Sequence, residues 1–428
     1  MGHYFVSPTL RYRYFYKLMR KIEYHTLSNG IRIVHNRVTT SKIVHCGIML
    51  DIGSRDESHE NQGIAHFWEH MAFKGTRKRK AFHIINRLDV LGGELNAFTD
   101  KEKILFYASL RETYFEKAVD LLTDITFDSV FPDNQIDRER KVILEEMAMY
   151  LDDPEDSLHD EFDRVVFGDH PLGMNILGTQ TTVQSFRKKD FRKFIREHLD
   201  TKKIIFSSVG NMDLKVVVQL AEKYMGHIPK ITSTRTRKKF KGYKPKEVTI
   251  RKNVQQARCA LGRPAYSIKD DKRSAFYMLV NILGGNGMNS RLNWALREKH
   301  GFVYSIGANY YPFSDTGLFM ISFGTEPSQL NKSLELIHLE MSKLKTRLLG
   351  VRQMNAAKEQ LLGHLATAEK NNMNFMIMMA RQLLDHGRIY AFDEIHERIK
   401  NTEAVTLAGL ANEIFDESRF SYLRMEPN

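Results

Sequence analysis

Two histidines and a glutamate stand close together in the segment His66-Phe-Trp-Glu-His70. If this segment is helical, His66 and His70 lie one above the other on the same face, because they are four residues apart. Two neutral imidazoles at that spacing can bind Zn²⁺, and a neighbouring carboxylate can accept a proton from water near the metal. The pattern H-x-x-E-H therefore predicts a zinc site with Glu69 as general base. With 17 histidines in the chain, a chance match is the alternative.

A second segment could supply the third protein ligand that a catalytic zinc ion needs. Residues 137–147 have the periodicity of a helix and carry Glu139, Glu145 and Glu146. Glutamates grouped on a helix most often form a solvated face, and motif matches are hypotheses. Taken alone, this helix leaves both interpretations open.

Together these segments resemble the M16 metallopeptidases, the family of insulinase, pitrilysin and the mitochondrial processing peptidase, whose H-x-x-E-H motif is called the inverzincin signature. In that family the distal zinc ligand is a glutamate at a similar separation, and here 75 residues lie between His70 and Glu146. The resemblance implies one Zn²⁺ per chain, bound by His66, His70 and Glu146. It also implies that Glu139, two helical turns earlier, orients the site from behind the ligands.

A segment in the second half, Leu296–Ser305, is similar to the family pattern L-R-x-x-x-G-x-x-Y-S. In the family its Arg and Tyr face the zinc across the substrate chamber, which implies catalytic roles for Arg297 and Tyr304. A guanidinium or a phenol in that place can stabilise an oxyanion. By themselves, the two residues would be interpreted as a surface Arg at a helix end and a Tyr packed in a strand.

The segment Gly92–Thr99 is similar to the family pattern G-G-x-x-N-A-x-T, an edge strand along which the substrate backbone aligns. The resemblance implies that Asn96 and Ala97 bind substrate, because an edge strand offers unpaired N–H and C=O groups to an extended peptide. A glycine turn before an ordinary strand is the alternative.

The chain also contains an internal repeat, in which residues 114–122 and 134–144 match residues 329–337 and 352–362. Strands interleaved with helix pairs predict an α+β fold of two homologous domains, each a mostly antiparallel sheet packed against helices. The repeat aligns Glu139 with Ala357 and Glu146 with His364, so only the first domain is expected to bind metal. The expected strands are residues 43–50, 103–109, 203–209, 248–250, 257–261, 303–311 and 318–324.

Charge and composition define the remaining parts of the chain. We expect a basic N-terminal extension at residues 1–22, a catalytic domain at 23–228, a basic linker at 229–247 and a second domain at 248–428. The net charge is +12, and residues 230–246 contain eight Lys or Arg and no acid. We interpret that stretch as a solvated linker and consider nucleic-acid binding unlikely, because no nucleic-acid-binding module accompanies it.

Three further expectations follow from the composition. Residues 1–22 lack the apolar core of a secretory signal, which leaves a transit peptide or a simple extension open. Cys46 and Cys259 lie in apolar surroundings and are expected to be buried free thiols. No apolar run approaches the roughly 20 residues that cross a bilayer, so no membrane partner is expected.

The resemblance implies a zinc-dependent endopeptidase that hydrolyses peptides in an enclosed chamber. The chain is similar to the short, two-repeat subfamily, which implies a homodimer or, second, a heterodimer with an inactive homologous subunit. A processing-peptidase β subunit that requires a different partner chain is an alternative, since Ala65–Thr76 is close to that family's segment. A catalytically silent core-type subunit is another. The implied location is the bacterial cytoplasm, or alternatively the mitochondrial matrix.

Overall fold

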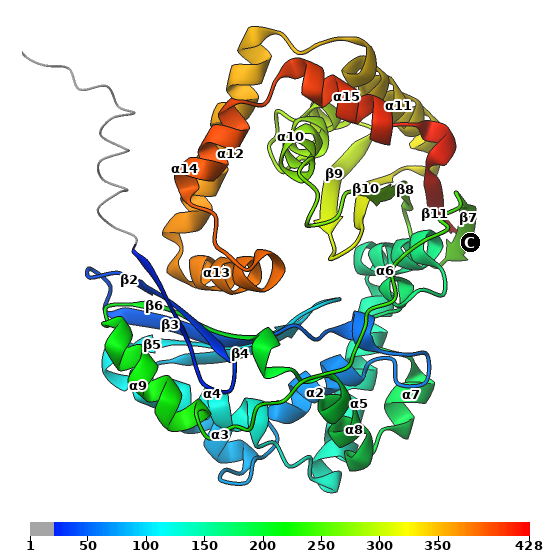
Figure 1. Cartoon of the computed structure of the whole chain (residues 1–428). Coiled ribbons are helices and arrows are strands. Elements are labelled where there is room, and N and C mark those ends of the chain that lie inside the picture. The colour runs from blue at the N-terminus through cyan, green and yellow to red at the C-terminus, as the bar shows by residue number, and fades with distance from the viewer. Residues whose placement is uncertain (1–20) are drawn as a thin grey trace, which may run out of the picture.

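The computed structural model describes residues 21–428, which form two β-sheets and the helices around them (Figure 1). The first sheet contains β1 (Ile22–Thr26), β2 (Arg32–Arg37), β3 (Ile43–Leu50), β4 (Glu94–Thr99), β5 (Ile104–Arg111) and β6 (Ile204–Gly210). The second contains β7 (Glu247–Lys252), β8 (Ala257–Ala265), β9 (Val303–Pro312), β10 (Gly317–Thr325) and β11 (Ser421–Pro427).

The helices follow the same division between the two halves of the chain. In the first half they are α2 (Ile64–Ala72), α3 (Ala81–Asp89), α4 (Phe115–Phe127), α5 (Asp133–Asp152), α6 (Pro154–Phe167), α7 (Gln180–Ser185), α8 (Lys188–His198) and α9 (Leu214–Met225). In the second they are α10 (Arg273–Gly284), α11 (Leu330–Thr346), α12 (Val351–Lys370), α13 (Asn372–His386), α14 (Phe392–Lys400) and α15 (Ala404–Ile414).

The strand order confirms the predicted fold class and the internal repeat. The first sheet has the order β1-β2-β6-β3-β5-β4, and the second has the order β7-β11-β8-β10-β9. Apart from β1, the two orders correspond strand by strand. Each sheet has one parallel pair, β2 with β6 and β7 with β11, and all its other pairs are antiparallel. The helix pair α4–α5 in the first half likewise corresponds to α11–α12 in the second.

Both faces of the first sheet are buried, which explains why its central strands are almost continuously apolar. On β3, alternate residues such as Val44 and Ile48 pack with α2, α4 and the other helices of the first half. Met49, one residue out of step, points to the opposite face and into a separate apolar cluster. The sequence pattern therefore requires helices on both sides of the sheet, and the first half supplies them on only one.

The second face of each sheet is covered by a helix from the other half (Figure 1). Helix α6 packs across β8 and β11 of the second sheet, and α13 packs across β2, β3 and β6 of the first. The residues that α6 buries are Leu158, Phe162, Val165, Val166 and Phe167, against Ala260, Leu318, Met320, Leu423 and Met425. Those that α13 buries are Phe375, Met376, Met379, Ala380 and Leu383, against Val34, Met49, Leu105, Ile205 and Val209.

The basic segment between the halves is not solvated throughout, so that part of the interpretation was wrong. The side chains of Arg235 and Arg237 are only 7% and 13% exposed. Both pair with Asp51 and Asp56 of the first half at N–O distances between 2.7 and 3.0 Å. These arginines hold the linker against the first half, since the buried carboxylate of Asp56 has no other cationic partner among the ion pairs of residues 21–428.

Three smaller expectations can be compared with the structure. Cys46 and Cys259 are buried and free, as predicted. Of the helices in residues 21–428, none is both long and apolar enough to cross a membrane. The predicted N-terminal extension falls, up to residue 20, outside the described residues.

Replacing Phe162 on α6 with Ala should destabilise the protein by about 3–5 kcal/mol, because the fully buried ring would leave a cavity against the second sheet. Urea unfolding followed by tryptophan fluorescence measures the loss. As a control, Val405→Ala on the exposed face of α15 should change stability by less than about 0.5 kcal/mol. Equal losses in the two variants would contradict the packing described for α6.

Candidate metal centre

Helix α2 begins at a tight turn that fixes the direction of its side chains. Gly63, before the first turn, has φ +92°, and a Cβ there would lie 2.5 Å from the carbonyl oxygen of Leu177. The buried Glu57 carboxylate accepts hydrogen bonds from the backbone N–H groups of Gly63 and Ala65, each at 2.8 Å. A carboxylate in this place also interacts favourably with the positive end of the helix dipole. Burial raises the pKa of Glu57 to about 8 despite these hydrogen bonds.

The two faces of α2 have different roles. Phe67 and Trp68 are fully buried in the core of the first half, as expected for the packed side of the helix. His66 and His70 lie on the face toward α5, and the centres of their rings are 4.5 Å apart. The packed side therefore fixes the helix so that both imidazoles meet α5.

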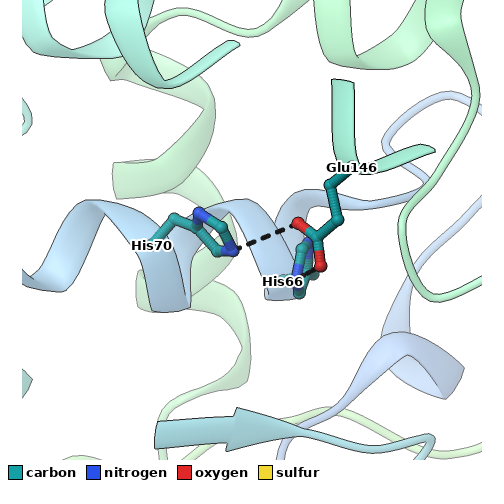
Figure 2. Close-up of side chains that lie close together, drawn as sticks. All are labelled: His66, His70 and Glu146. Atoms are coloured by element: carbon teal, nitrogen blue, oxygen red, sulfur yellow. Dashed lines mark ion pairs between the residues drawn. The ribbon is translucent and has the colours of Figure 1, made fainter. Parts of the chain in front are cut away.

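Glu146 on α5 completes a group of three potential metal ligands (Figure 2). Its Oε1 is 3.8 Å from Nε2 of His66, and its Oε2 is 3.5 Å from Nε2 of His70. Two ligand atoms that bind zinc tetrahedrally at about 2.1 Å lie about 3.4 Å apart, so the observed separations suit a shared ion. Within residues 21–428, this is the one group of three or more His, Cys, Asp or Glu side chains close enough to hold a metal.

The neutral ring of His66 and an unpartnered oxygen of Glu146 also fit a cation. Burial, with the neighbouring His70, lowers the pKa of His66 to about 3, so that its ring is neutral at pH 7 as a ligand must be. Burial raises the pKa of Glu146, and its Oε2 is buried without a hydrogen-bond partner. A buried carboxylate oxygen of this kind is costly unless a cation or a donor is present. The donor set, two imidazoles and a carboxylate, is one that zinc prefers.

Glu139 on α5 contacts the ring nitrogen of His70 that faces away from the other two ligands' shared side, Nδ1. Its Oε1 is 3.0 Å from Nδ1 of His70, and its Oε2 is 2.7 Å from Nζ of Lys74. This contact holds the proton on Nδ1 and leaves Nε2 free to bind a metal. Burial lowers the pKa of His70, but the hydrogen bond to Glu139 and the nearby carboxylates raise it more. For Glu139, burial raises the pKa, but the hydrogen bonds to His70 and Lys74 lower it by more. The pKa of Glu139 therefore lies below its ordinary value.

Glu69 lies beside the three ligands and is held by strand β4. The hydroxyl of Thr99 donates a hydrogen bond of 2.5 Å to Oε2 of Glu69. Burial raises the pKa of Glu69 above its ordinary value, although the Thr99 hydrogen bond and His70 oppose the shift. A carboxylate with a raised pKa can both accept and return a proton near neutral pH.

Strand β4 is at the edge of the first sheet, as the resemblance implied for residues 92–99. It carries Asn96 and Ala97, the predicted substrate-binding residues. The backbone N–H of Ala97 donates to the side-chain oxygen of Asn96 at 2.8 Å. A side chain thus accepts a hydrogen bond from this backbone amide.

Arg297 and Tyr304 lie in the second half, on the π-helical turn Asn293–Glu298 and on β9. The guanidinium of Arg297 is 5.6 Å from the centre of the Tyr304 ring, and Tyr304 is 81% exposed. No hydrogen bond or ion pair joins either of them to His66, His70 or Glu146 within residues 21–428. The chain therefore brings together five of the predicted residues around α2 and α5, and leaves this pair apart from them.

Sequence reasoning missed three residues that support the site. Thr99 is the last residue of the segment Gly92–Thr99, but the neighbouring residues in the sequence do not indicate that its hydroxyl reaches Glu69. Lys74 follows the motif by one turn, and its partner Glu139 is remote in sequence. Glu57 caps α2 from six residues before Gly63, which is outside the usual spacing of a capping residue.

Comparison with known proteins gives matches along most of the chain. A family model for insulinase (peptidase family M16) matches residues 32–180, and a model for the peptidase M16 inactive domain matches residues 185–361. An uncharacterized zinc protease of Bacillus subtilis is 31% identical over 92% of this chain and 96% of its own length. Another, from Streptomyces coelicolor, is 33% identical over 91% of this chain and 86% of its own length.

Two solved structures have the same fold. A protease from Helicobacter pylori superposes with a TM-score of 0.88 at 21% identity, covering 96% of this chain and all of that one. A protein from Pseudomonas fluorescens described as a peptidase M16 inactive domain also has a TM-score of 0.88, at 15% identity, over 95% of this chain and 98% of its own. At these identities the two structures establish the arrangement of two homologous domains and no more.

Replacing Glu139 with Gln should lower the affinity for Zn²⁺ by about 10–100-fold, because an amide holds the His70 ring less firmly than a carboxylate. Competition against a chromogenic chelator measures the dissociation constant. Glu145→Gln is the matched control, since Glu145 is exposed on the same helix, and it should leave the affinity unchanged. Equal affinities in wild type and Glu139→Gln would remove Glu139 from the site.

Proposed function

This chain belongs to peptidase family M16, and from that premise we propose that it is a zinc-dependent endopeptidase acting on peptides in an enclosed chamber. The observation that carries the proposal is the cluster of His66, His70 and Glu146, with Glu69 beside it. The relatives named above are bacterial zinc proteases. We accordingly propose a location in the cytoplasm of a bacterial cell.

In the proposed reaction, His66, His70 and Glu146 hold one zinc ion. When bound, zinc lowers the pKa of water and polarises the carbonyl of the scissile bond. Thr99 holds Oε2 of Glu69, which leaves Oε1 to accept the proton of the attacking water. Glu69 then delivers that proton to the nitrogen of the leaving amine. The Lys74–Glu139–His70 contacts keep Nδ1 of His70 protonated throughout.

We propose that the substrate pairs with β4 as an added strand. An extended peptide can replace the contact between the Asn96 side chain and the Ala97 N–H, because a backbone carbonyl accepts the same hydrogen bond. The peptide backbone would then run past Thr99, the residue that holds Glu69. Backbone pairing of this kind selects extended peptides regardless of their side chains.

We further propose a homodimer in which Arg297 and Tyr304 of a second copy complete each site. In the described part of the chain no hydrogen bond or ion pair joins the pair to the three ligands or to Glu69, and Tyr304 is exposed. Two large apolar side chains near Tyr304 along the chain, Met288 and Trp294, are 67% and 62% exposed. Exposed apolar groups of this size are typical of interfaces. At the site, the guanidinium and the phenol would donate hydrogen bonds to the developing oxyanion.

Replacing Glu69 with Gln should lower kcat by at least about a hundredfold, because the amide cannot accept the proton. Cleavage of a quenched fluorescent peptide library measures the rate, and metal analysis should find wild-type zinc content. In the wild type, a chelator should abolish cleavage and added Zn²⁺ should restore it. Full activity in Glu69→Gln would reject its assignment as the base, and cleavage unaffected by chelation would reject the zinc mechanism.

Complementation between two inactive variants tests the second copy. Tyr304→Phe should lower kcat by about a hundredfold without loss of zinc. Refolding Glu69→Gln together with Tyr304→Phe should restore about a quarter of wild-type activity, because half of the dimers then contain one site with both residues intact. No recovery in dimers verified by light scattering would place the pair in the same chain as the zinc. A monomeric mass would reject the homodimer.

A further inference from the structure

A cavity of about 250 Å³ lies within the second half of the chain, where α10 packs with α12, α14 and β9 (Figure 1). Two arginines line it, Arg273 at the start of α10 and Arg398 on α14, and among residues 21–428 no Asp or Glu does. The aliphatic part of its wall comes from α12 and α14 and consists of Leu361, Leu365, Ile395 and Ile399. The cavity therefore combines an apolar wall with positive charge.

Three guanidinium groups surround the ring of Tyr390, which is part of the same wall. The guanidinium carbons of Arg388, Arg398 and Arg273 lie 4.3, 4.9 and 5.7 Å from the centre of that ring. Glu394 pairs with Arg388 at 2.8 Å and with Arg398 at 3.0 Å. One carboxylate thus serves two of the guanidinium groups, and the cluster carries net positive charge.

Arg273 is the member of this cluster without a counter-charge. Its side chain is half-buried and, within residues 21–428, makes no ion pair or hydrogen bond. Asp385, which lines a second cavity together with Arg273, pairs instead with Lys103 at 2.8 Å. A guanidinium has five N–H donors in a planar fork that matches a carboxylate. Those of Arg273 are therefore available to an anion from outside the chain.

The positive charge also acts on His386, at the end of α13. Burial and the nearby Arg273, Lys103 and Arg388 lower the pKa of its imidazole to about 4. These charges are all cationic, and they make a further positive charge unfavourable at this position. The same field attracts an anion.

An adjoining cavity of about 290 Å³ extends the apolar space. The two cavities share four wall residues, Leu365, Gln382, Tyr390 and Ile395. The rest of the second wall is chiefly apolar and includes Ala368, Phe375, Met378 and Phe392. Together the cavities are within the size range of small-molecule sites, about 300–1,000 Å³. An apolar chain whose head lies at Arg273 can therefore extend toward the second cavity.

We propose that these two cavities bind a carboxylate that carries an apolar chain, either a free fatty acid or the C-terminal end of an apolar peptide. The carboxylate accepts a bidentate hydrogen bond from Arg273, with Arg398 as a second cation. The chain is stabilised by removal of its apolar surface from water. The site shares no residue with the metal centre, so the inference does not depend on the proposed peptidase activity.

Isothermal titration calorimetry of the full-length protein with octanoate, decanoate and dodecanoate tests the inference. The affinity should rise by about fourfold for each methylene that enters the cavities. Octanol, which has the same chain as octanoate without the charge, should bind about tenfold more weakly or less. Arg273→Gln should weaken decanoate binding by about tenfold or more, because the amide cannot form a charge-assisted bidentate pair.

Arg352→Gln is the matched control, because Arg352 is an exposed arginine on α12 that lines neither cavity. It should leave the affinity for decanoate within about twofold of wild type. Equal affinities for decanoate in wild type and Arg273→Gln would overturn the site and place the carboxylate elsewhere, for instance at bound zinc. Equal affinities for octanoate and octanol in the wild type would also overturn it, whether or not the Arg273 variant folds.

A peptide that ends in Leu-Leu, compared with its C-terminal amide, distinguishes the two sources of the carboxylate. Binding of decanoate without the peptide assigns the site to free acids. Binding of the peptide acid, but not of its amide or of decanoate, assigns it to peptide ends. If neither decanoate nor the peptide acid binds, the inference is rejected.

Discussion

The exchange of α6 and α13 between the two halves is the constraint on which the rest of the structure depends. Each sheet has two apolar faces, and the helices of its own half cover only one of them. The remaining face is buried by the exchanged helix, with Phe162 on one side and Met376 and Met379 on the other. Exposing either face to water would lose the hydrophobic free energy gained where the exchanged helix packs on the sheet. Neither half can therefore be stable in this form without its counterpart.

This exchange also fixes the metal centre. Helix α6 follows α5 after a single residue, Asp153, whose carboxylate caps α6 by accepting from the N–H groups of Glu155 and Asp156. The docking of α6 on the second sheet thus holds the C-terminal end of α5, which lies less than two turns beyond Glu146. At the other side of the site, the packing of Trp68 and Phe67 fixes α2. The three ligands come together only when α2 and α5 are both fixed in place. That geometry is therefore a property of the whole two-domain fold.

Buried ion pairs also join the two halves of the chain. Arg55, whose side chain is 1% exposed, pairs with Glu102 at 2.7 Å and with Asp315 at 2.6 Å. The backbone N–H and hydroxyl of Ser314 also donate to Glu102. The turn between β9 and β10 is in this way bound to the loop that follows β4, three residues after Thr99. Because unpaired buried ions are strongly unfavourable, the halves must meet in this register for Arg55 to pair with both carboxylates.

The sequence alone determined what is local or periodic. The i, i+4 spacing predicted the two imidazoles on one face of α2, and apolar alternation and the internal repeat predicted the sheets and the helix pairs. The choice among Glu139, Glu145 and Glu146 was not contained in the helical pattern and came from the family resemblance. Only the tertiary structure decided that Thr99 holds Glu69, that the linker arginines pair with Asp51 and Asp56, and that α6 and α13 exchange. These contacts join residues far apart in the chain, and their formation depends on how whole elements pack, which no local pattern of residues encodes.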